Sequence, residues 1–317
     1  MKHEAGETTI CGQPQKVAAL SPRALDVMLS LGIQPDAYAE ETLLNPRLHK
    51  FDNPSQQIPY LGERITTQPI NLGDRFTPSL EKLVLLKPDL IVVVENGHNL
   101  YEQLSKIAPT LVLDNRVGKE GWSRRLQVLA QAFNYEEQAQ QVIDNYYQKL
   151  TEAKEQLAPV VATYPRVLPI ALSLKIEPIN VYSYDSDSAE LLEAIGFQLV
   201  LLDQYPERKD YQATGSPQIP VEALSQLDAD IIIVHARDRN NNLSHPQEAV
   251  KQQWEQHPIL RNLPTSREGR VYFVNGDLWG SNIGGPITDE LILERLPDLL
   301  LLSLEGATNS RSEQGSP

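Results

Sequence analysis

The sequence predicts an α/β protein in which two lobes with largely parallel sheets are joined by one long helix. Short apolar runs, each the length of a buried strand, alternate with segments of helical periodicity through both halves of the chain. A proline-free stretch of helical periodicity separates the halves. One helix and strand segment also occurs twice, with Glu81 of the first copy corresponding to Glu222 of the second.

The first strand is predicted over residues 17–20 and is followed by a helix. Ser21 is a good N-cap. Pro22 stands in the first turn of the helix, where a backbone N–H would have no partner within the helix and its absence therefore costs nothing. Apolar residues then recur at helical spacing until Gly32. The remaining elements predicted for this lobe are strands at 37–39, 90–94 and 110–113 and a helix at 79–86.

Residues 122–157 contain no proline and show only helical periodicity, which predicts one long helix or two in succession. A continuous helix over 136–157 would span about 33 Å, enough to run along a whole lobe. A strand at 167–172 then restarts the alternation. The predicted divisions are an N-terminal lobe at 1–121, a linking helical segment at 122–160, a C-terminal lobe at 161–304 and a disordered tail at 305–317.

The internal repeat indicates that the two lobes are related. Residues 80–93 align with 221–234: Glu is second, Leu fourth and seventh, Asp tenth, and four aliphatic residues follow. In parallel sheets the chemistry gathers at the loops after the carboxyl ends of buried strands. Those loops are predicted at 95–98, Glu-Asn-Gly-His, and at 235–238, His-Ala-Arg-Asp. If the lobes face each other, both loops open onto one cleft.

The charge balance argues against a nucleic-acid partner. The chain has 28 basic and 42 acidic residues, a formal net charge of −14, whereas phosphate binding needs clustered Lys and Arg. No apolar run approaches the roughly 20 residues of a membrane span. The N-terminus lacks the apolar core of a signal peptide, so we expect either a cytoplasmic chain or a mature form. The single cysteine, Cys11, excludes an internal disulfide.

Motifs typical of enzymes are missing from the sequence, including the Gly-x-Ser-x-Gly elbow and the Gly-rich phosphate loop. The six histidines show no His-x-His or His-x-x-x-His spacing, which disfavours a compact metal site made only of protein side chains. Arginines and aromatic residues at predicted loop mouths instead suit a ligand with anionic oxygens, because guanidinium presents a planar fork of donors. These candidates are Arg23, Arg64, Arg75, Arg116, Tyr182, Tyr184, Arg237 and Trp279.

Each candidate also has a simpler explanation. Most of the arginines are equally well explained as solvated surface charges, and Trp279 would either fill a core edge or stack on a ligand. Glu81 and Glu222 each stand in the first turn of a predicted helix, where the helix dipole favours a carboxylate. Their equivalent positions in two lobes would also make a two-point dock for a basic partner surface.

A family resemblance runs in order from about residue 3 to about residue 304. It is carried by KVAALSPRALDVMLSLGIQPDAY, PSLEKLVLLKPDLIVVV, LLEAIGF, IPVEALSQLDADIIIV and REGRVYFVNGDLW, and by the opening HEAGETTI. On these segments the chain resembles the periplasmic binding proteins of ABC importers for ferric siderophores, with cobalamin and haem binders as close relatives.

The resemblance implies two Rossmann-like lobes around a shallow cleft, bridged by one rigid helix, with no enzymatic step and no cofactor. The ligand would be an iron(III)–siderophore complex of hydroxamate or citrate type, with iron bound through the siderophore and not by protein ligands. A haem or cobalamin binder on the same fold is the alternative, and an enzyme or chelatase on a similar fold is a third. The implied partners are the permease subunits of an ABC importer. The implied protein is a monomer in the periplasm, or a lipoprotein in its precursor form.

The resemblance also suggests roles for individual residues. Arg75 matches the arginine that ferric-hydroxamate binders place shortly before Pro-x-Leu-Glu. Those binders carry a tyrosine after the next strand, where this chain has Gly97-His98, although a histidine can still donate a hydrogen bond. The implied ligand-binding residues are Arg75, Tyr184, Trp279, Arg237, His98, Arg23, Arg64 and Tyr182. Glu81 and Glu222 match acids that meet arginines on the membrane subunits, and a haem binder would take its axial ligand from His98, His235 or Tyr184.

Overall fold

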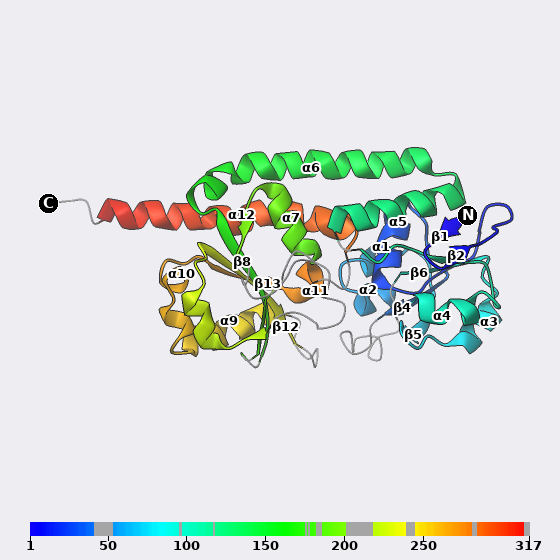
Figure 1. Ribbon diagram of the computed structural model, residues 1–317, viewed down its shortest axis with the longest axis horizontal. Coiled ribbons are helices and arrows are strands. Elements are labelled where there is room, and N and C mark those ends of the chain that lie inside the picture. Colours follow the sequence, from blue (N-terminus) through cyan, green and yellow to red (C-terminus); the bar gives the residue numbers. More distant parts are fainter. Residues whose placement is uncertain are drawn as a thin grey trace. The chain divides into compact units, whose positions relative to one another are not determined.

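The computed structural model describes residues 1–40, 53–94, 97–116, 118–174, 176, 178–181, 186–200, 218–238, 245–280 and 284–313, with helix side chains up to residue 301. The chain divides into two compact units (Figure 1), Met1–Tyr146 with Ser281–Asp289 and Tyr147–Gly280 with Glu290–Pro317. Each unit contains one large sheet, of five strands in unit 1 and six in unit 2, together with helices, which confirms the predicted α/β fold class. The predicted lobe limits stay a prediction.

The sheet of unit 1 is parallel throughout. Its strand order is β5 (Ile70–Asp74), β4 (Ala37–Glu40), β3 (Val17–Ala19), β6 (Leu90–Val93), β7 (Thr110–Val112). All strands but β5 are buried along their whole length, as expected for parallel strands covered on both faces. An antiparallel hairpin of β1 (Lys2–His3) and β2 (Gly6–Glu7) precedes this sheet and was not predicted.

The helices of unit 1 begin where the capping residues predict. The Ser21 side chain accepts a hydrogen bond from the backbone N–H of Ala24, which confirms the N-cap of α1. Ser79 caps the next long helix in the same way, through the N–H of Lys82. The helices of this unit are α1 (Pro22–Ser30), α2 (Pro54–Gln57), the 3-10 helix η2 (Gly62–Arg64), α3 (Leu80–Leu86), α4 (Gly97–Leu104) and α5 (Gly118–Phe133).

The sheet of unit 2 is mixed. Its strand order is β11 (Gln218–Ile219), β9 (Ile179–Val181), β8 (Arg166–Ser173), β12 (Ile231–Arg237), β13 (Val271–Asn275), with β10 (Gln198–Leu199) also paired to β8. The pairs among β8, β10, β12 and β13 are parallel, whereas β9 pairs antiparallel with both of its neighbours, β8 and β11. Its helical segments are α7 (Asp187–Ile195), η3 (Val221–Gln226), α9 (Pro246–Gln256), η4 (Leu260–Asn262), α10 (Pro264–Arg267) and α11 (Gly276–Trp279).

The internal repeat has a structural counterpart. β6 lies between β3 and β7, and β12 lies between β8 and β13, so the repeated strand occupies the same place in each sheet. The repeated helix differs, because α3 is an α-helix whereas η3 is a 3-10 helix. Pro220 offers no capping side chain where Ser79 provides one, and the Ser225 hydroxyl bonds to the Glu222 carbonyl at 2.7 Å.

The predicted linking segment consists of two helices in succession, α5 and α6 (Glu136–Thr163). Asn134 has a φ of 55°, the left-handed conformation that commonly ends a helix. The last helix, α12, runs over Pro286–Glu313, so residues 305–313 are helical where disorder was expected. Extending an existing helix costs less than nucleating one, which explains why polar residues continue it. In the described residues no helix is both long and apolar enough to cross a bilayer.

Candidate functional site

The parallel sheet of unit 1 gathers candidate residues at one edge. Because its strand pairs are all parallel, the carboxyl ends of its strands share that edge. Arg23 follows β3, Glu40 ends β4, Arg75 follows β5, His98 follows β6 and Asn115 follows β7. The structure therefore brings the predicted residues Arg23, Arg75 and His98 to the same side of one sheet.

Arg75 is held against the end of β4. Its side chain is buried, and its backbone N–H donates to the carbonyl of Glu40 at 2.8 Å. Its guanidinium lies over the ring of Phe76, with Cζ 4.8 Å from the ring centroid. The Asp74 carboxylate accepts the Phe76 N–H at 2.9 Å and shapes this turn. A cation and the buried acid Glu40 thus lie on neighbouring strand ends.

Arg23 has a structural explanation. It is buried, and its Nη1 donates to the carbonyl and the side-chain oxygen of Asn115, both at 3.3 Å. Arg125, which the sequence analysis did not single out, donates to the carbonyls of Asp114 at 3.0 Å and Arg116 at 2.8 Å. Two buried arginines from α1 and α5 therefore hold the loop after β7. A ligand-binding role for Arg23 stays a prediction.

Arg116 is engaged in the same loop. Its Nε lies 3.0 and 2.9 Å from the two carboxylate oxygens of Asp114, and its Nη1 is 3.3 Å from Glu120. Burial favours the neutral acid, but the hydrogen bonds from the Arg116 side chain and backbone outweigh it and hold the pKa of Asp114 below its ordinary value. Arg116 is therefore explained by this ion pair.

The other predicted residues of the first lobe are exposed or lie elsewhere. His98 is exposed in the first turn of α4, and Arg64 is exposed at the end of η2. The structure places Arg64 in the segment between β4 and β5, and its carbonyl accepts a hydrogen bond from the Gln34 side chain at 3.2 Å. Tyr182 and Tyr184 lie outside the described residues, as do Glu95 and Asn96.

The prediction that His235 begins the loop after β12 is wrong. The strand is longer than the repeat suggested, and His235 lies within it, fully buried and paired in register with Val274. Its ring packs edge-on against Trp279, with 5.9 Å between centroids. Burial, together with the charge of Arg237, lowers the pKa of His235 to about 3, although a hydrogen bond with the Trp279 backbone opposes the shift. His235 is thus a neutral residue buried within β12 and not a loop residue.

Trp279 ends α11 and is buried against the ring of His235. Two roles were expected for Trp279, and its burial matches the one in which it fills the edge of the core. Stacking on a ligand stays a prediction.

Arg237 is the most constrained candidate. It is the last residue of β12 and half-buried, and the glycines Gly276 and Gly280 leave room for its side chain. A Cβ at Gly280 would lie 2.0 Å from Nη2, and one at Gly276 would lie 2.5 Å from Cγ. Among the residues that the structure describes, no hydrogen-bond partner contacts Nε or Nη2 of Arg237. The fold therefore holds a guanidinium whose donors suit an anionic acceptor.

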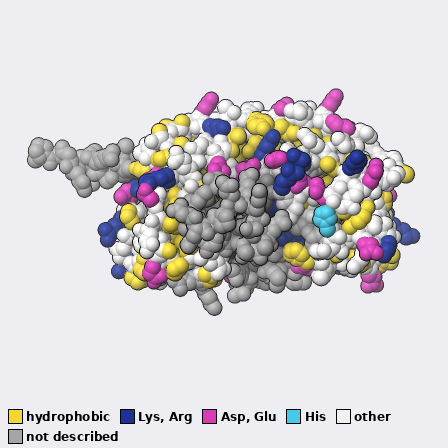
Figure 2. Space-filling view, in the orientation of Figure 1, with side chains coloured by type: hydrophobic (Ala, Val, Ile, Leu, Met, Phe, Trp, Pro, Cys, Tyr) yellow, Lys and Arg dark blue, Asp and Glu magenta, His cyan; other side chains and the backbone are white. Residues whose placement is uncertain are grey.

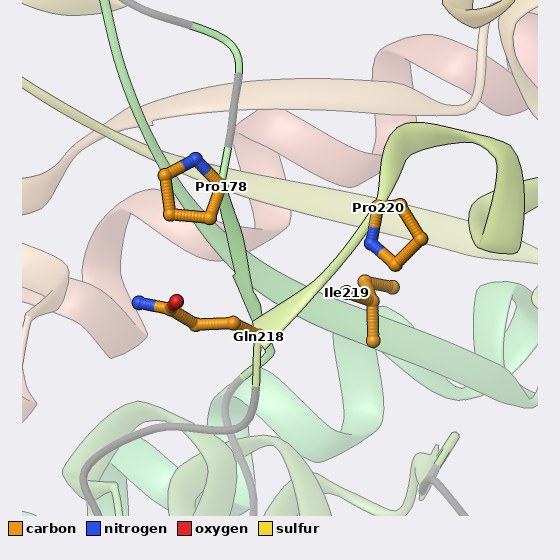
Figure 3. A pocket seen from close by; sticks show the side chains of 4 residues that line it. All are labelled: Pro178, Gln218, Ile219 and Pro220. Atoms are coloured by element: carbon orange, nitrogen blue, oxygen red, sulfur yellow. The ribbon is translucent and has the colours of Figure 1, made fainter.

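Two pockets lie in unit 2. One of about 430 Å³ is lined by Pro178, Gln218, Ile219 and Pro220, with the two proline rings on opposite sides (Figure 3). Another of about 360 Å³ is lined by residues of α9, β13 and α12. Among the described residues that line them, neither pocket includes a predicted site residue. In the described ranges, no group of three or more His, Cys, Asp or Glu side chains is placed to hold a metal ion.

Charged side chains of both signs lie on the face shown in Figure 2. In the described part of the face in Figure 2, basic and acidic side chains are interspersed and form no extended basic patch. Glu81 and Glu222 are both exposed, each in the first turn of its helix. Both are therefore accessible to a partner, as the repeat predicts.

Known proteins resemble the chain over most of its length. A family model described as "Periplasmic binding protein" matches residues 17–278. The Fe(3+)-citrate-binding protein YfmC of Bacillus subtilis (strain 168) is 27% identical over 279 residues, covering 87% of this chain and 78% of that protein. The achromobactin-binding periplasmic protein of Dickeya dadantii (strain 3937) is 27% identical over 283 residues, covering 89% and 85%.

Solved structures share the fold. Staphylococcus aureus SirA, in complex with staphyloferrin B, superposes with a TM-score of 0.73 at 23% identity and covers 95% of this chain and 98% of its own. The petrobactin-binding protein YclQ from Bacillus subtilis superposes with a TM-score of 0.71 at 19% identity, covering 95% and 97%. At these identities the likeness establishes the architecture.

Proposed function

The chain belongs to the periplasmic binding protein family, and we propose that it captures a ferric siderophore and delivers it to an ABC importer. Its named relatives bind ferric citrate, achromobactin and ferric anguibactin. The family and these relatives are binding proteins and not enzymes, so the activity is recognition without turnover. The ligand is an iron(III) complex whose metal is held by the siderophore, and no resident cofactor is involved.

The observation that carries this proposal is the guanidinium of Arg237. Its Nε and Nη2 are buried and have no hydrogen-bond partner in the described part of the chain, and two glycines leave the room that the side chain occupies. A ferric siderophore presents anionic oxygens around its iron, and a guanidinium binds such oxygens with two parallel donors. A preorganised cation also loses little entropy when the ligand arrives.

Arg75 provides the corresponding cation in unit 1. Its guanidinium is already stacked on Phe76 and held at the sheet edge by the turn after β5, so it too is oriented before binding. We propose that Arg75 and Arg237 bind ligand oxygens, with Trp279, Tyr182 and Tyr184 covering the organic shell. Arg23, Arg64 and His98 complete the proposed set.

Within the siderophores, we favour citrate or hydroxamate complexes. Both surround iron with hard anionic oxygens that suit arginine, and a ferric-citrate binder is among the named relatives. A haem or cobalamin binder is the alternative on this fold. His235 lies buried inside β12 against Trp279, which leaves His98 as the exposed described candidate for an axial ligand.

Calorimetric titration of the purified protein with ferric citrate and ferric schizokinen, together with a visible-absorption titration with haem, tests the proposal. We expect saturable binding of at least one ferric complex and no change in the haem absorption spectrum. Arg237→Ala should weaken that binding about 10-fold to 100-fold, because a charge-assisted hydrogen bond contributes about 1.5–3 kcal/mol. Arg237→Lys should recover it only in part, since lysine lacks the planar fork.

Arg261→Ala is the matched control, because Arg261 is an exposed arginine of unit 2 that lies in η4. It should leave the affinity unchanged. Saturable haem binding with an axial-ligand spectrum and no response to either ferric complex would contradict the siderophore assignment.

We also propose where and with what the protein works. Relatives are named as periplasmic proteins or lipoproteins. These names support a location in the periplasm, either as a free protein or, for a lipidated precursor, as a protein anchored to the membrane. Glu81 and Glu222 are exposed and would meet basic side chains of the permease subunits. We propose a monomer as the form that docks.

A further inference from the structure

The outer face of α3 combines an acid with two bare aliphatic side chains. Glu81, Val84 and Leu85 stand at positions i, i+3 and i+4, so they share one face of the helix. All three are exposed: Val84 retains 54% and Leu85 74% of its accessible surface. Leu83, on the opposite side, is fully buried and supplies the core contact. We call Glu81, Val84 and Leu85 the α3 face.

Most of the exposed large apolar side chains lie on α3 or on the segment just before it. The large hydrophobic residues that are exposed in the described part of the chain are Ile70, Phe76, Val84, Leu85 and Tyr147, and all but Tyr147 lie on β5, α3 or the turn between them. β5 and α3 pack together, with the Lys82 ammonium donating to the Asn71 carbonyl at 2.7 Å. Single exposed hydrophobics are ordinary, but a group of them beside a charge marks an interaction surface.

The internal repeat provides a comparison within the same chain. The residues that correspond to the α3 face are Glu222, Ser225 and Gln226, and all three are exposed. This η3 face keeps the acid but replaces both aliphatic side chains with polar ones. The hydroxyl of Ser225 is also engaged, because it donates to the Glu222 carbonyl. The two acidic faces are therefore chemically unlike, and only the α3 face offers apolar area for burial.

We propose that the α3 face packs against an apolar patch beside a basic side chain on a membrane subunit of the importer, whereas the η3 face makes a polar contact alone. This inference rests on the proposed function and adds to it the chemistry of the partner surface. Burial of Val84 and Leu85 would supply most of the docking affinity, and Glu81 would select the basic neighbour. Since the two faces are not interchangeable, the binding protein would dock in one orientation.

Other occupants of the α3 face are less compatible with its charge. A phospholipid surface is commonly anionic and would repel both Glu81 and a chain of net charge −14. A two-fold contact with a second copy of the chain would bring two Glu81 carboxylates together. The basic residue next to Glu81, Lys82, is bonded to the Asn71 carbonyl. The partner that fits is cationic and apolar.

Binding of the full-length chain to nanodiscs that carry the importer's membrane subunits, from the organism that encodes it, tests this inference. The variant V84S/L85Q gives the α3 face the side chains of the η3 face. We expect its docking affinity to fall about tenfold or more, the size typical of losing a central apolar contact. Its affinity for ferric citrate and its melting temperature should stay the same, because both side chains are exposed.

Two further variants sharpen the result. Tyr147→Ser removes the exposed hydrophobic side chain of α6, which lies outside the α3 face, and should dock like the parent chain. V84I/L85M keeps apolar side chains on the face and should retain docking.

Equal docking of V84S/L85Q and the parent chain would overturn the inference while leaving the proposed function intact. Parent binding to lipid-only nanodiscs that V84S/L85Q abolishes, or a parent dimer in sedimentation that V84S/L85Q dissolves, would also overturn it, in favour of a membrane or a second copy. The calorimetric titration described above measures separately whether the parent chain binds a ferric complex. If it binds none, the proposed function is overturned instead.

Discussion

Asp26 is a buried acid that fixes the start of α12. Its carboxylate accepts the backbone N–H groups of Ile287 at 3.0 Å and Thr288 at 3.1 Å. A Cβ at Gly285 would lie 2.3 Å from its Cγ, so glycine is required there. Burial raises the pKa of Asp26 to about 6, although the two backbone hydrogen bonds, the Thr288 side chain and the charge of Arg125 oppose the shift. A favourable helix N-terminus thus compensates only part of the cost of burying the carboxylate.

Asp26 should therefore make the protein less stable as the pH rises from about 4 to about 6. Its folded-state pKa lies above the unfolded value of 3.8, so stability that is fully present below that value is lost as the pH rises through the folded pKa. A shift of about two units corresponds to about 3 kcal/mol of unfolding free energy. Urea unfolding of the parent and Asp26→Asn between pH 4 and pH 7 should show their stability difference moving by that amount in favour of the variant. A difference independent of pH would refute this.

Gly280 is expected to act on ligand binding through Arg237. In Gly280→Ala the new Cβ would overlap Nη2 of Arg237 and displace the guanidinium. We expect about a tenfold loss of ferric-complex affinity, similar to that of losing one charge-assisted hydrogen bond. In the Arg237→Ala background the same substitution should cost much less, because the closest overlap is gone. Additive effects in this double-mutant cycle would show that Gly280 acts independently of Arg237.

At the scale of elements, the N-terminal hairpin is tied to the first sheet by a histidine network. The Thr8 hydroxyl donates to the Thr110 carbonyl at 2.9 Å and lies 2.9 Å from His3 Nε2, which therefore donates to it. The N–H of Ala5 donates to His3 Nδ1 at 3.2 Å, and the His3 ring packs on Tyr101. This network uses the neutral imidazole. It gives a structural meaning to HEAGETTI, for which the sequence analysis predicted no element.

Acid should loosen this hairpin. Burial, and then the charge of the N-terminus, lowers the pKa of His3, with His98 adding to the shift and Glu4 opposing it. A lowered folded-state pKa means that the stabilisation is present above the ordinary value of 6.5 and is lost as the pH falls through the folded pKa. Hydrogen exchange of the Glu4 N–H, bonded to the Val112 carbonyl at 2.9 Å, should report faster opening at pH 5 than at pH 7, after correction for the intrinsic rate. His3→Asn should remove that dependence, and an unchanged dependence would exclude His3 as its source.

At the scale of the whole molecule, two units each carry a sheet and one exposed acid of the repeat. We expect Glu81→Ala combined with Glu222→Ala to leave ferric-complex binding in solution unchanged and to abolish iron import by cells. Neither carboxylate has a described contact with Arg75 or Arg237, which is why capture and delivery should separate. Uptake of radioactive iron presented as ferric citrate, alongside calorimetry of the purified variant, measures the two steps. The control is Glu137→Ala with Glu255→Ala, two exposed acids outside the repeat, and import by the double variant at the parent rate would remove the docking role.

Much of the fold follows from local patterns. Strand and helix alternation predicts the α/β class, Ser21 predicts the start of α1, and the repeat predicts the equivalent places of β6 and β12. Periodicity and capping depend on residues within a few positions of one another, and the repeat compares two such local patterns, which is why the sequence reveals these features. The difference between α3 and η3 was within reach, because Pro220 stands where Ser79 supplies a cap.

The sequence by itself determined the fold class, the family resemblance, the exposed acids and the arginines that suit an anionic ligand. Only the tertiary structure decided which of those residues are already engaged. His235 became a buried core residue, Arg23 became the support of a loop, and Arg237 gained its setting from glycines about 40 residues further along the chain. The physical reason is that burial and hydrogen bonding depend on which distant strands become neighbours. No local sequence pattern specifies which strands become neighbours. Arginines and histidines that are indistinguishable as candidates in the sequence therefore differ in burial and hydrogen bonding in the structure.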